Sequence, residues 1–185
     1  MSPQWDLLFS SGFSARFAGT WIEGGDPESL ARILGVDPAS RLDCDLPTAL
    51  QWYRPHGTDD VIWIGEHAPG WTHIISLSGL CIFPGPLSAE GRRLFYVEYD
   101  GGEGGLDGLD YWRDGDRAGR SGQHAIDLGE LEPLFERHAI DIEAVDDDED
   151  EMDAYLRLLG HVTGRFIDQE WLAATRTLYR IPDSA

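Results

Sequence analysis

The clearest signal in the chain is an alternation of large apolar and aromatic residues across residues 61–79. Two such runs flank the segment His67-Ala68-Pro69-Gly70, which contains the two strongest turn-forming residues. In the second run, every other residue from Trp71 to Leu77 falls on one face, which is the period of a β-strand. The pattern predicts a hairpin at the centre of a sheet.

Three other segments have the alternation or the β-branched content of strands. Residues 17–22 predict a first strand, residues 93–99 a later one, and residues 106–113 the last strand. Residues 100–105 form a Gly-rich turn between the second and third of these. The stretch that follows the last predicted strand, residues 114–123, is polar and Gly-rich.

One early helix is marked at both ends. Asp26 suits its N-cap, Pro27 suits its first turn, and Gly35 provides a natural stop. Two other segments stay ambiguous from the pattern alone. Residues 5–9 fit a short helix or an edge segment, and residues 48–53 fit a helical turn or a short strand.

From residue 128 onward the apolar residues recur with the period of an α-helix. We expect three helices, whose apolar faces are Leu131, Leu134, Phe135 and His138; Met152, Tyr155, Leu156 and Leu159; and Trp171, Leu172, Thr175 and Leu178. Gly160 is expected to end the second helix, and Asp168 is expected to cap the third.

This order of elements predicts a single α+β domain over residues 1–185. We expect an antiparallel sheet of five or six strands, an early short helix, and three C-terminal helices packed on one face. Residues 1–125 should be mainly sheet with one helix, and residues 126–185 should be helical. The length suits one such domain with its own core.

The composition is strongly acidic, with 34 acidic residues against 14 basic ones and a formal net charge of −20. This balance argues against non-specific binding to nucleic acids or anionic membranes, which requires a basic face. All the basic residues are Arg, and Asn is also absent, which indicates a GC-rich genome. Cys44 and Cys81 have no metal-binding spacing, and no signal-peptide or membrane-spanning pattern is present. The sequence predicts a soluble cytoplasmic protein.

Acidic residues are densest in residues 141–153, which hold nine acids and no base. The centre of this stretch is the run Asp146, Asp147, Asp148, Glu149, Asp150 and Glu151. Acids suit the first turn of a helix because of its dipole, so a solvated helix start explains the run. The functional interpretation is a docking surface for a basic protein partner, or a mimic of nucleic-acid phosphates.

A second candidate surface combines the aromatic and basic residues Tyr111, Trp112, Arg113, Arg117 and Arg120. These residue types are enriched at binding hot spots, and three Arg could hold a carboxylate or a phosphate. In the alternative interpretation, the two rings pack in the sheet while the Arg side chains pair with Asp114 and Asp116.

No catalytic residue, cofactor or metal is predicted. Six histidines are scattered along the chain, and His67 and His73, on the two arms of the hairpin, lack an indicated third ligand. The Gly-rich residues 100–108 fit neither a calcium-binding repeat nor a phosphate-binding loop, because Leu106 replaces a ligand and no Gly-Lys-Ser/Thr follows. None of the common nucleophile or zinc-protease motifs is present.

Four segments occur in a recognisable order: GGDPESLARILGVDP, GWTHIISLSG, DYWRDGDRAG and LLGHVTGRFIDQEWL. Together they resemble an uncharacterised family of small acidic proteins from GC-rich bacteria, known only as a domain of unknown function. The matching positions are Gly70-Trp71, Ser78-Gly79, Arg117-x-Gly119 and Thr163-Gly164. The resemblance implies turns, caps and core aromatics at these positions, and it implies no particular activity. The acidic run lies outside the shared motifs.

The sequence favours a non-enzymatic protein-interaction module, such as an immunity or antitoxin-type protein that covers a basic partner. The alternative is an enzyme or small-ligand-binding protein with a site on the sheet, formed by Trp63, Trp71 and the three Arg side chains. A deep pocket converging on those residues would favour the alternative, and a flat acidic face would favour the module. A DNA mimic is a weaker alternative, and the sequence does not indicate the oligomeric state.

Overall fold

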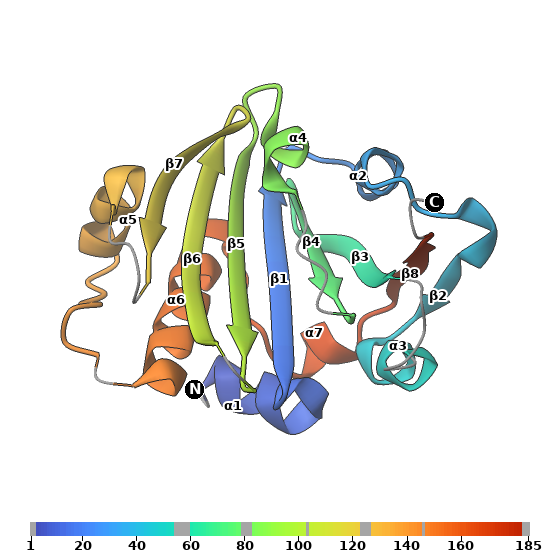
Figure 1. Cartoon of the computed structure of the whole chain (residues 1–185), viewed down its shortest axis with the longest axis horizontal. Helices are drawn as coiled ribbons and strands as arrows, with labels where there is room; N and C mark the ends of the chain where they lie inside the picture. The colour runs from blue at the N-terminus through green and yellow to red at the C-terminus, as the bar shows by residue number, and fades with distance from the viewer. Residues whose placement is uncertain are drawn as a thin grey trace.

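The computed structural model describes residues 3–53, 60–78, 83–102, 104–122, 127–145 and 147–182. Within them the chain forms one antiparallel sheet of eight strands, in the order β2-β8-β3-β4-β1-β5-β6-β7 (Figure 1). The strands are β1 (Arg16–Glu23), β2 (Leu42–Cys44), β3 (Asp60–Ala68), β4 (Trp71–Ser76), β5 (Arg93–Asp100), β6 (Gly105–Arg113), β7 (Asp116–Ser121) and β8 (Arg176–Ile181).

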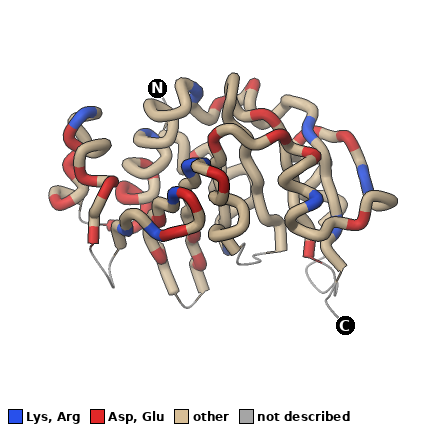
Figure 2. Tube along the Cα trace, turned by 90° about the horizontal axis from the view of Figure 1, so that it is seen from above, with Lys and Arg blue, Asp and Glu red and all other residues tan. Residues whose placement is uncertain are grey.

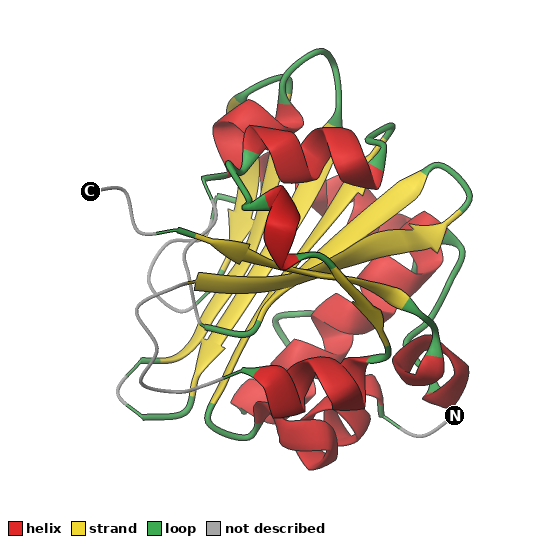
Figure 3. Ribbon diagram, turned by 90° about the vertical axis from the view of Figure 1, so that its right-hand side faces the viewer, coloured by secondary structure: helices red, strands yellow, loops and turns green. Residues whose placement is uncertain are grey.

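The same residues contain seven α-helices and three other helical turns. The helices are α1 (Gln4–Leu8), α2 (Pro27–Ile33), α3 (Leu46–Trp52), α4 (Pro84–Ser88), α5 (Glu132–Arg137), α6 (Asp148–Thr163) and α7 (Gln169–Ala173). The turns are η1 (Phe9–Phe13), η2 (Pro38–Ser40) and η3 (Gly129–Leu131). Figure 3 shows the helices packed around the twisted sheet.

The predicted central hairpin is confirmed. β3 and β4 pair antiparallel on either side of a turn in which Gly70 has a φ of 80°, a conformation that favours glycine. Both strands are buried along most of their length, because helices cover both faces of the sheet at this point. Trp63 faces the larger of two core clusters, and Ile62 and Ile64 face the smaller one.

The early helix is also confirmed as α2. The Asp26 carboxylate accepts a 2.9 Å hydrogen bond from the backbone N–H of Ser29, and Pro27 occupies the first turn. Gly35 follows the helix with a φ of 70°. The cap, the first-turn proline and the terminal glycine thus act as their residue types predict.

The predicted sheet of five or six strands with three C-terminal helices is wrong, because the described residues form eight strands and seven helices. β7 lacks apolar alternation because it is an edge strand whose buried positions are Gly119 and Ser121. β8 lies inside the sheet, between β2 and β3. The predicted last helix merged α7 with this strand, since Thr175 and Leu178 happen to continue a helical spacing beyond Ala173.

The helices also differ in placement. The two ambiguous early segments are helical, as α1 and α3, and α4 is an additional helix between β4 and β5. Residues from α2 and α4 belong to the smaller core cluster, whereas residues from α1, α3, α5, α6 and α7 belong to the larger one. The sheet therefore carries helices on both faces.

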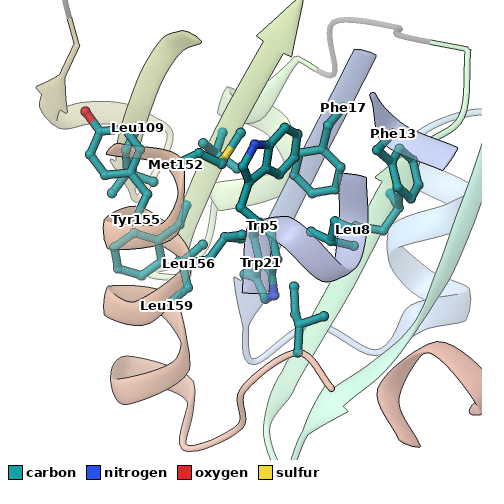
Figure 4. Close-up of a cluster of buried hydrophobic side chains, with 14 of the residues drawn as sticks. Trp5, Leu8, Phe13, Phe17, Trp21, Leu109, Met152, Tyr155, Leu156 and Leu159 are labelled. Carbon is teal, nitrogen blue, oxygen red and sulfur yellow. The ribbon is translucent and has the colours of Figure 1, made fainter. Parts of the chain in front are cut away.

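α6 is the longest helix and forms one wall of the larger core. Figure 4 shows Met152, Tyr155, Leu156 and Leu159 facing Trp5 of α1. The predicted stop at Gly160 is wrong, because α6 continues to Thr163 and is capped by Gly164, which has a φ of 79°. Gly160 is an interior position, and a Cβ there would lie 2.3 Å from the ring of Phe166. Its lack of a side chain admits that ring against the helix.

Candidate functional site

The acidic run at the start of α6 is partly explained by local structure. Asp146 lies outside the described residues. The Asp147 carboxylate caps α6 by accepting hydrogen bonds from the backbone N–H groups of Glu149 and Asp150, at 3.1 and 2.9 Å. The Asp148 carboxylate accepts a 3.1 Å hydrogen bond from the backbone N–H of Leu106, which ties the helix start to β6.

Of the other three residues of the run, one contacts a buried side chain and two are exposed to solvent. Glu151 accepts a hydrogen bond from the Tyr155 hydroxyl, and burial together with this carboxylate raises the pKa of Tyr155. Glu149 and Asp150 are exposed, and neither side chain forms an ion pair within the described residues. These two carboxylates are the members of the run that a partner could contact directly.

Acidic residues are concentrated over a longer segment than the run itself. Residues 127–153 hold thirteen acids and a single base, Arg137, which amounts to −12 of the total charge of −20. This segment comprises η3, α5, the following loop and the start of α6, and it forms one end of the molecule (Figure 1). Figure 2 shows acidic positions gathered at that end, on the left of the view. We refer to residues 127–153 as the acidic end.

The acidic end contains a groove of about 360 Å³ between α5 and the loop that follows it. Its floor is apolar and is formed by Leu128, Phe135, Ala139, Ile140 and Ile142. Phe135 and Ile140 are buried, Leu128 and Ile142 are half-buried, and Ala139 is exposed. The groove is therefore an apolar surface that remains open to solvent.

The backbone at the end of α5 creates this groove. Ala139 has a φ of 52°, a left-handed conformation that reverses the chain after the helix. The N–H of Ala139 donates to the carbonyl oxygen of Glu136 at 3.1 Å, and the N–H of Ile140 donates to that of Phe135 at 3.0 Å. These bonds tie Ile140 back to the helix that precedes it, and residues 140–143 line the groove together with α5.

The rim of the groove is acidic. Its carboxylates are Glu132, Glu136, Asp141 and Glu143. All four are exposed, and within the described part of the chain none of them forms an ion pair. Among the described residues that line the groove, none is basic. An apolar floor below uncompensated carboxylates suits an occupant that is both apolar and cationic.

The residues of the second predicted surface mostly contact other residues of the protein itself. Tyr111 is buried and stacks on Phe95 with a centroid distance of 4.7 Å, on the larger-core face of the sheet. Trp112 packs on the opposite face, where the guanidinium of Arg117 lies 5.3 Å from its ring centroid. The two rings therefore belong to different faces of β6 and do not form a common surface.

The three Arg side chains of that surface each meet a carboxylate. Arg113 pairs with Glu130 at 3.2 Å, Arg117 with Asp110 at 3.4 Å, and Arg120 with Asp107 at 2.9 Å. Asp107 and Asp110 lie on β6, and Glu130 lies in η3. They differ from the predicted partners, Asp114 and Asp116. Burial raises the pKa of Asp110, against the opposing effect of Arg120 and Arg117. The guanidinium groups are thus engaged by the protein itself.

His67 and His73 lie side by side in the core, with ring centroids 5.9 Å apart. His67 accepts a 2.9 Å hydrogen bond at Nδ1 from Trp171 Nε1, so its Nε2 carries the proton and donates to the carbonyl oxygen of Arg165 at 3.0 Å. The rings of Trp63 and Trp171 lie 5.0 and 4.8 Å from that of His73. Within the described residues, neither ring nitrogen of His73 has a hydrogen-bond partner.

Burial lowers the pKa of both histidines, to about 4 for His67 and well below its ordinary value for His73. Both rings are therefore neutral at physiological pH. No group of three or more His, Cys, Asp or Glu side chains in the described segments could hold a metal ion. The pair forms part of the core, together with the aromatic rings around it.

The two Trp side chains of the predicted alternative site on the sheet belong to the core. Trp63 is fully buried, and Trp71 is nearly so. Trp71 borders a hollow of about 340 Å³ beside Asp26 and Glu66, but neither Trp63 nor any of the three Arg side chains lines it. Cys44 is buried, as its small apolar character suggests, and Cys81 lies outside the described residues.

Comparison with protein-family models, with curated proteins and with solved structures returned no match to this chain. The family resemblance stays a prediction, and Gly79, one of its matching positions, lies outside the described residues. Among the helices that the structure describes, none combines the length and the apolar character needed to cross a membrane.

Glu132 and Glu136, which are not among the predicted site residues, lie four residues apart on α5. Such a spacing places two side chains on the same face of a helix. The predicted helix over this segment rests only on its apolar stripe. The groove itself could not be found this way, because it depends on the left-handed conformation of Ala139.

Proposed function

We propose that this protein is a non-enzymatic interaction module that binds a basic protein partner through its acidic end. Immunity and antitoxin-type proteins, which cover a basic partner in the cytoplasm, are examples of such a module. The observation that carries the proposal is the concentration of thirteen acids and one base in residues 127–153. The rest of the chain, by comparison, is only moderately acidic.

The exposed carboxylates of the acidic end support this proposal. The exposed carboxylates of Glu149 and Asp150, and those on the rim of the groove, have no cationic partner within the described residues. Their mutual repulsion is unfavourable in the isolated protein and would be relieved by a basic partner. The Arg-containing surface of β6 and β7 has fewer charges available to a partner, because its guanidinium groups already pair with carboxylates.

The proposal is tested by chemical cross-linking in cells of the protein's own host, followed by identification and purification of the captured partner. We expect a basic protein whose dissociation constant rises steeply between about 50 and about 500 mM salt, because salt screens exposed charges. A captured partner that is not basic, a complex insensitive to salt, or no specific partner would contradict the proposal. Competition by duplex DNA for the same partner would indicate a DNA mimic instead.

A charge-matched pair of variants locates the contact. The variant Glu149→Gln/Asp150→Asn removes two charges from the acidic end, and Asp6→Asn/Glu170→Gln removes two exposed charges elsewhere. The first variant should weaken the purified complex more than the second. Equal weakening would show that only the total charge matters.

A further inference from the structure

We propose that the groove beside α5 binds a short amphipathic segment of the partner, with apolar side chains on its floor and Arg or Lys at its rim. This inference rests on the proposed function and adds the position and the chemistry of the contact. It concerns the groove lined by Phe135, Ile140 and Ile142, rather than the acidic run at the start of α6.

The floor of the groove requires an apolar occupant. Leu128 and Ile142 are half-buried side chains that remain in contact with water. Covering them would remove apolar surface from water, which is favourable and does not depend on charge. A volume of about 360 Å³ lies at the small end of the range for ligand sites and suits a few side chains better than a large cofactor.

The rim determines the charge of that occupant. Glu132 and Glu136 lie on the helix side, and Asp141 and Glu143 lie on the loop side, so carboxylates flank the floor along both walls. A polyanion would be repelled by this arrangement. Guanidinium or ammonium groups placed on either side of an apolar residue would meet carboxylates while that residue occupies the floor. An amphipathic segment in a groove is a recurrent mode of peptide recognition.

The occupant is a different protein rather than a second copy of this chain. A second copy would bring an equally acidic end, and its basic residues are largely committed. Eight Arg side chains already form ion pairs within the described residues: Arg16, Arg41, Arg92, Arg93, Arg113, Arg117, Arg120 and Arg157. Charge complementarity therefore points to a basic segment from another protein.

The test uses a displayed library of random peptides of about 12 residues, a length that can fill a groove, selected against the full-length protein. We expect the enriched peptides to combine apolar residues with Arg or Lys on both sides. Enriched peptides without basic residues, or the absence of enrichment, would overturn the proposal.

Two triple variants then locate the binding site of a synthesised enriched peptide. Glu132→Gln/Glu136→Gln/Glu143→Gln removes three charges from the rim, and Asp6→Asn/Glu66→Gln/Glu170→Gln removes three exposed charges elsewhere. The rim variant should weaken binding by about tenfold and the control variant by about twofold. Equal weakening would overturn the groove as the site, although the proposed binding of a basic partner would stand.

The apolar floor is tested separately by Ile142→Ser, which leaves every rim charge in place. It should weaken the enriched peptide by about tenfold but leave unchanged the weaker binding of a matched peptide whose apolar residues are replaced by Ser. Circular dichroism and thermal unfolding show whether the variant is folded. If it is folded and binds the enriched peptide as tightly as the original protein does, the floor is not part of the site.

Discussion

The indole N–H of Trp171 donates a 2.9 Å hydrogen bond to Nδ1 of His67, which joins α7 to β3 inside the core. The bond fixes the tautomer of His67, so that its Nε2 donates to the carbonyl oxygen of Arg165 between α6 and α7. One neutral ring therefore connects the central strand to the C-terminal helices. Protonation of that ring would replace an accepted hydrogen bond with a repulsive contact.

We expect the protein to lose stability as the pH falls from 6.5 towards 4. The folded-state pKa of His67 is about 4, below its ordinary value of 6.5, so the unfolded chain binds this proton more readily in that window. Stability from this group is complete above pH 6.5, and its loss on acidification amounts to about 3 kcal/mol. The lowered pKa of His73 acts in the same direction.

The measurement is urea unfolding across this pH range for the original protein and for His67→Gln. A Gln can accept and donate hydrogen bonds but does not titrate, so the variant should show a shallower pH dependence. If the two proteins lose stability in parallel between pH 6.5 and 4.5, His67 is not the group responsible.

We expect Trp171→Phe to destabilise the fold by about 1–3 kcal/mol more than Trp21→Phe does. Both indoles are buried, and each substitution removes a similar volume. Trp171 loses a hydrogen bond and leaves His67 Nδ1 unsatisfied, whereas within the described residues the indole nitrogen of Trp21 has no partner to lose. Thermal or urea unfolding provides the comparison, and equal losses would contradict the importance of the bond.

Gly65→Ala should destabilise the protein through Arg176. A Cβ at residue 65 would lie 2.0 Å from Cδ of Arg176, whose half-buried side chain crosses β3 and lies 5.9 Å from the ring centroid of Trp63. Displacing that side chain should cost about 1–3 kcal/mol. In an Arg176→Ala background the same substitution should cost less. A double-mutant cycle in which the two effects simply add would contradict this explanation.

Asp147→Ala should destabilise the protein by about 1 kcal/mol, because it removes the carboxylate that caps α6. Asp147→Asn retains an acceptor and should be better tolerated. Asp150→Asn, at an exposed position in the first turn, provides the control and should have a smaller effect. Similar losses for all three variants would show that charge at the helix start, rather than capping, determines the stability.

Much of the central fold could be predicted because its signals are local. The hairpin of β3 and β4 is encoded by alternation and by Gly70, and α2 is encoded by Asp26, Pro27 and Gly35. These residues specify their conformation whatever the rest of the chain does. For such elements, the local signal of a few residues agrees with the final fold.

Strands β7 and β8, two of the three that the pattern does not predict, have no such signal. β7 is recognisable only from its partner, because β6 supplies the apolar neighbours and leaves Gly119 and Ser121 at the buried positions. β8 pairs with β2 and with β3, which precede it by more than a hundred residues. Non-local pairing can override a short helical spacing such as that of Thr175 and Leu178.

Only part of the candidate site could be predicted, because the contacts of its residues depend on the fold. The acidic run is visible in the sequence, but the roles of Asp147 as a cap and of Asp148 as a contact to β6 depend on the fold. The partners of Arg117 and Arg120 are Asp110 and Asp107, across paired strands, rather than their neighbours in sequence. Pairing between strands decides which charges remain available to a partner.

The most direct test of the proposed function is amide hydrogen exchange of the purified protein with and without its captured partner. We predict that added protection is concentrated in residues 127–153, with the strongest effect in α5 and residues 139–143, and that high salt removes it. Protection centred instead on β5, β6 and β7, or protection that persists in high salt, would contradict binding of a basic partner by the acidic end.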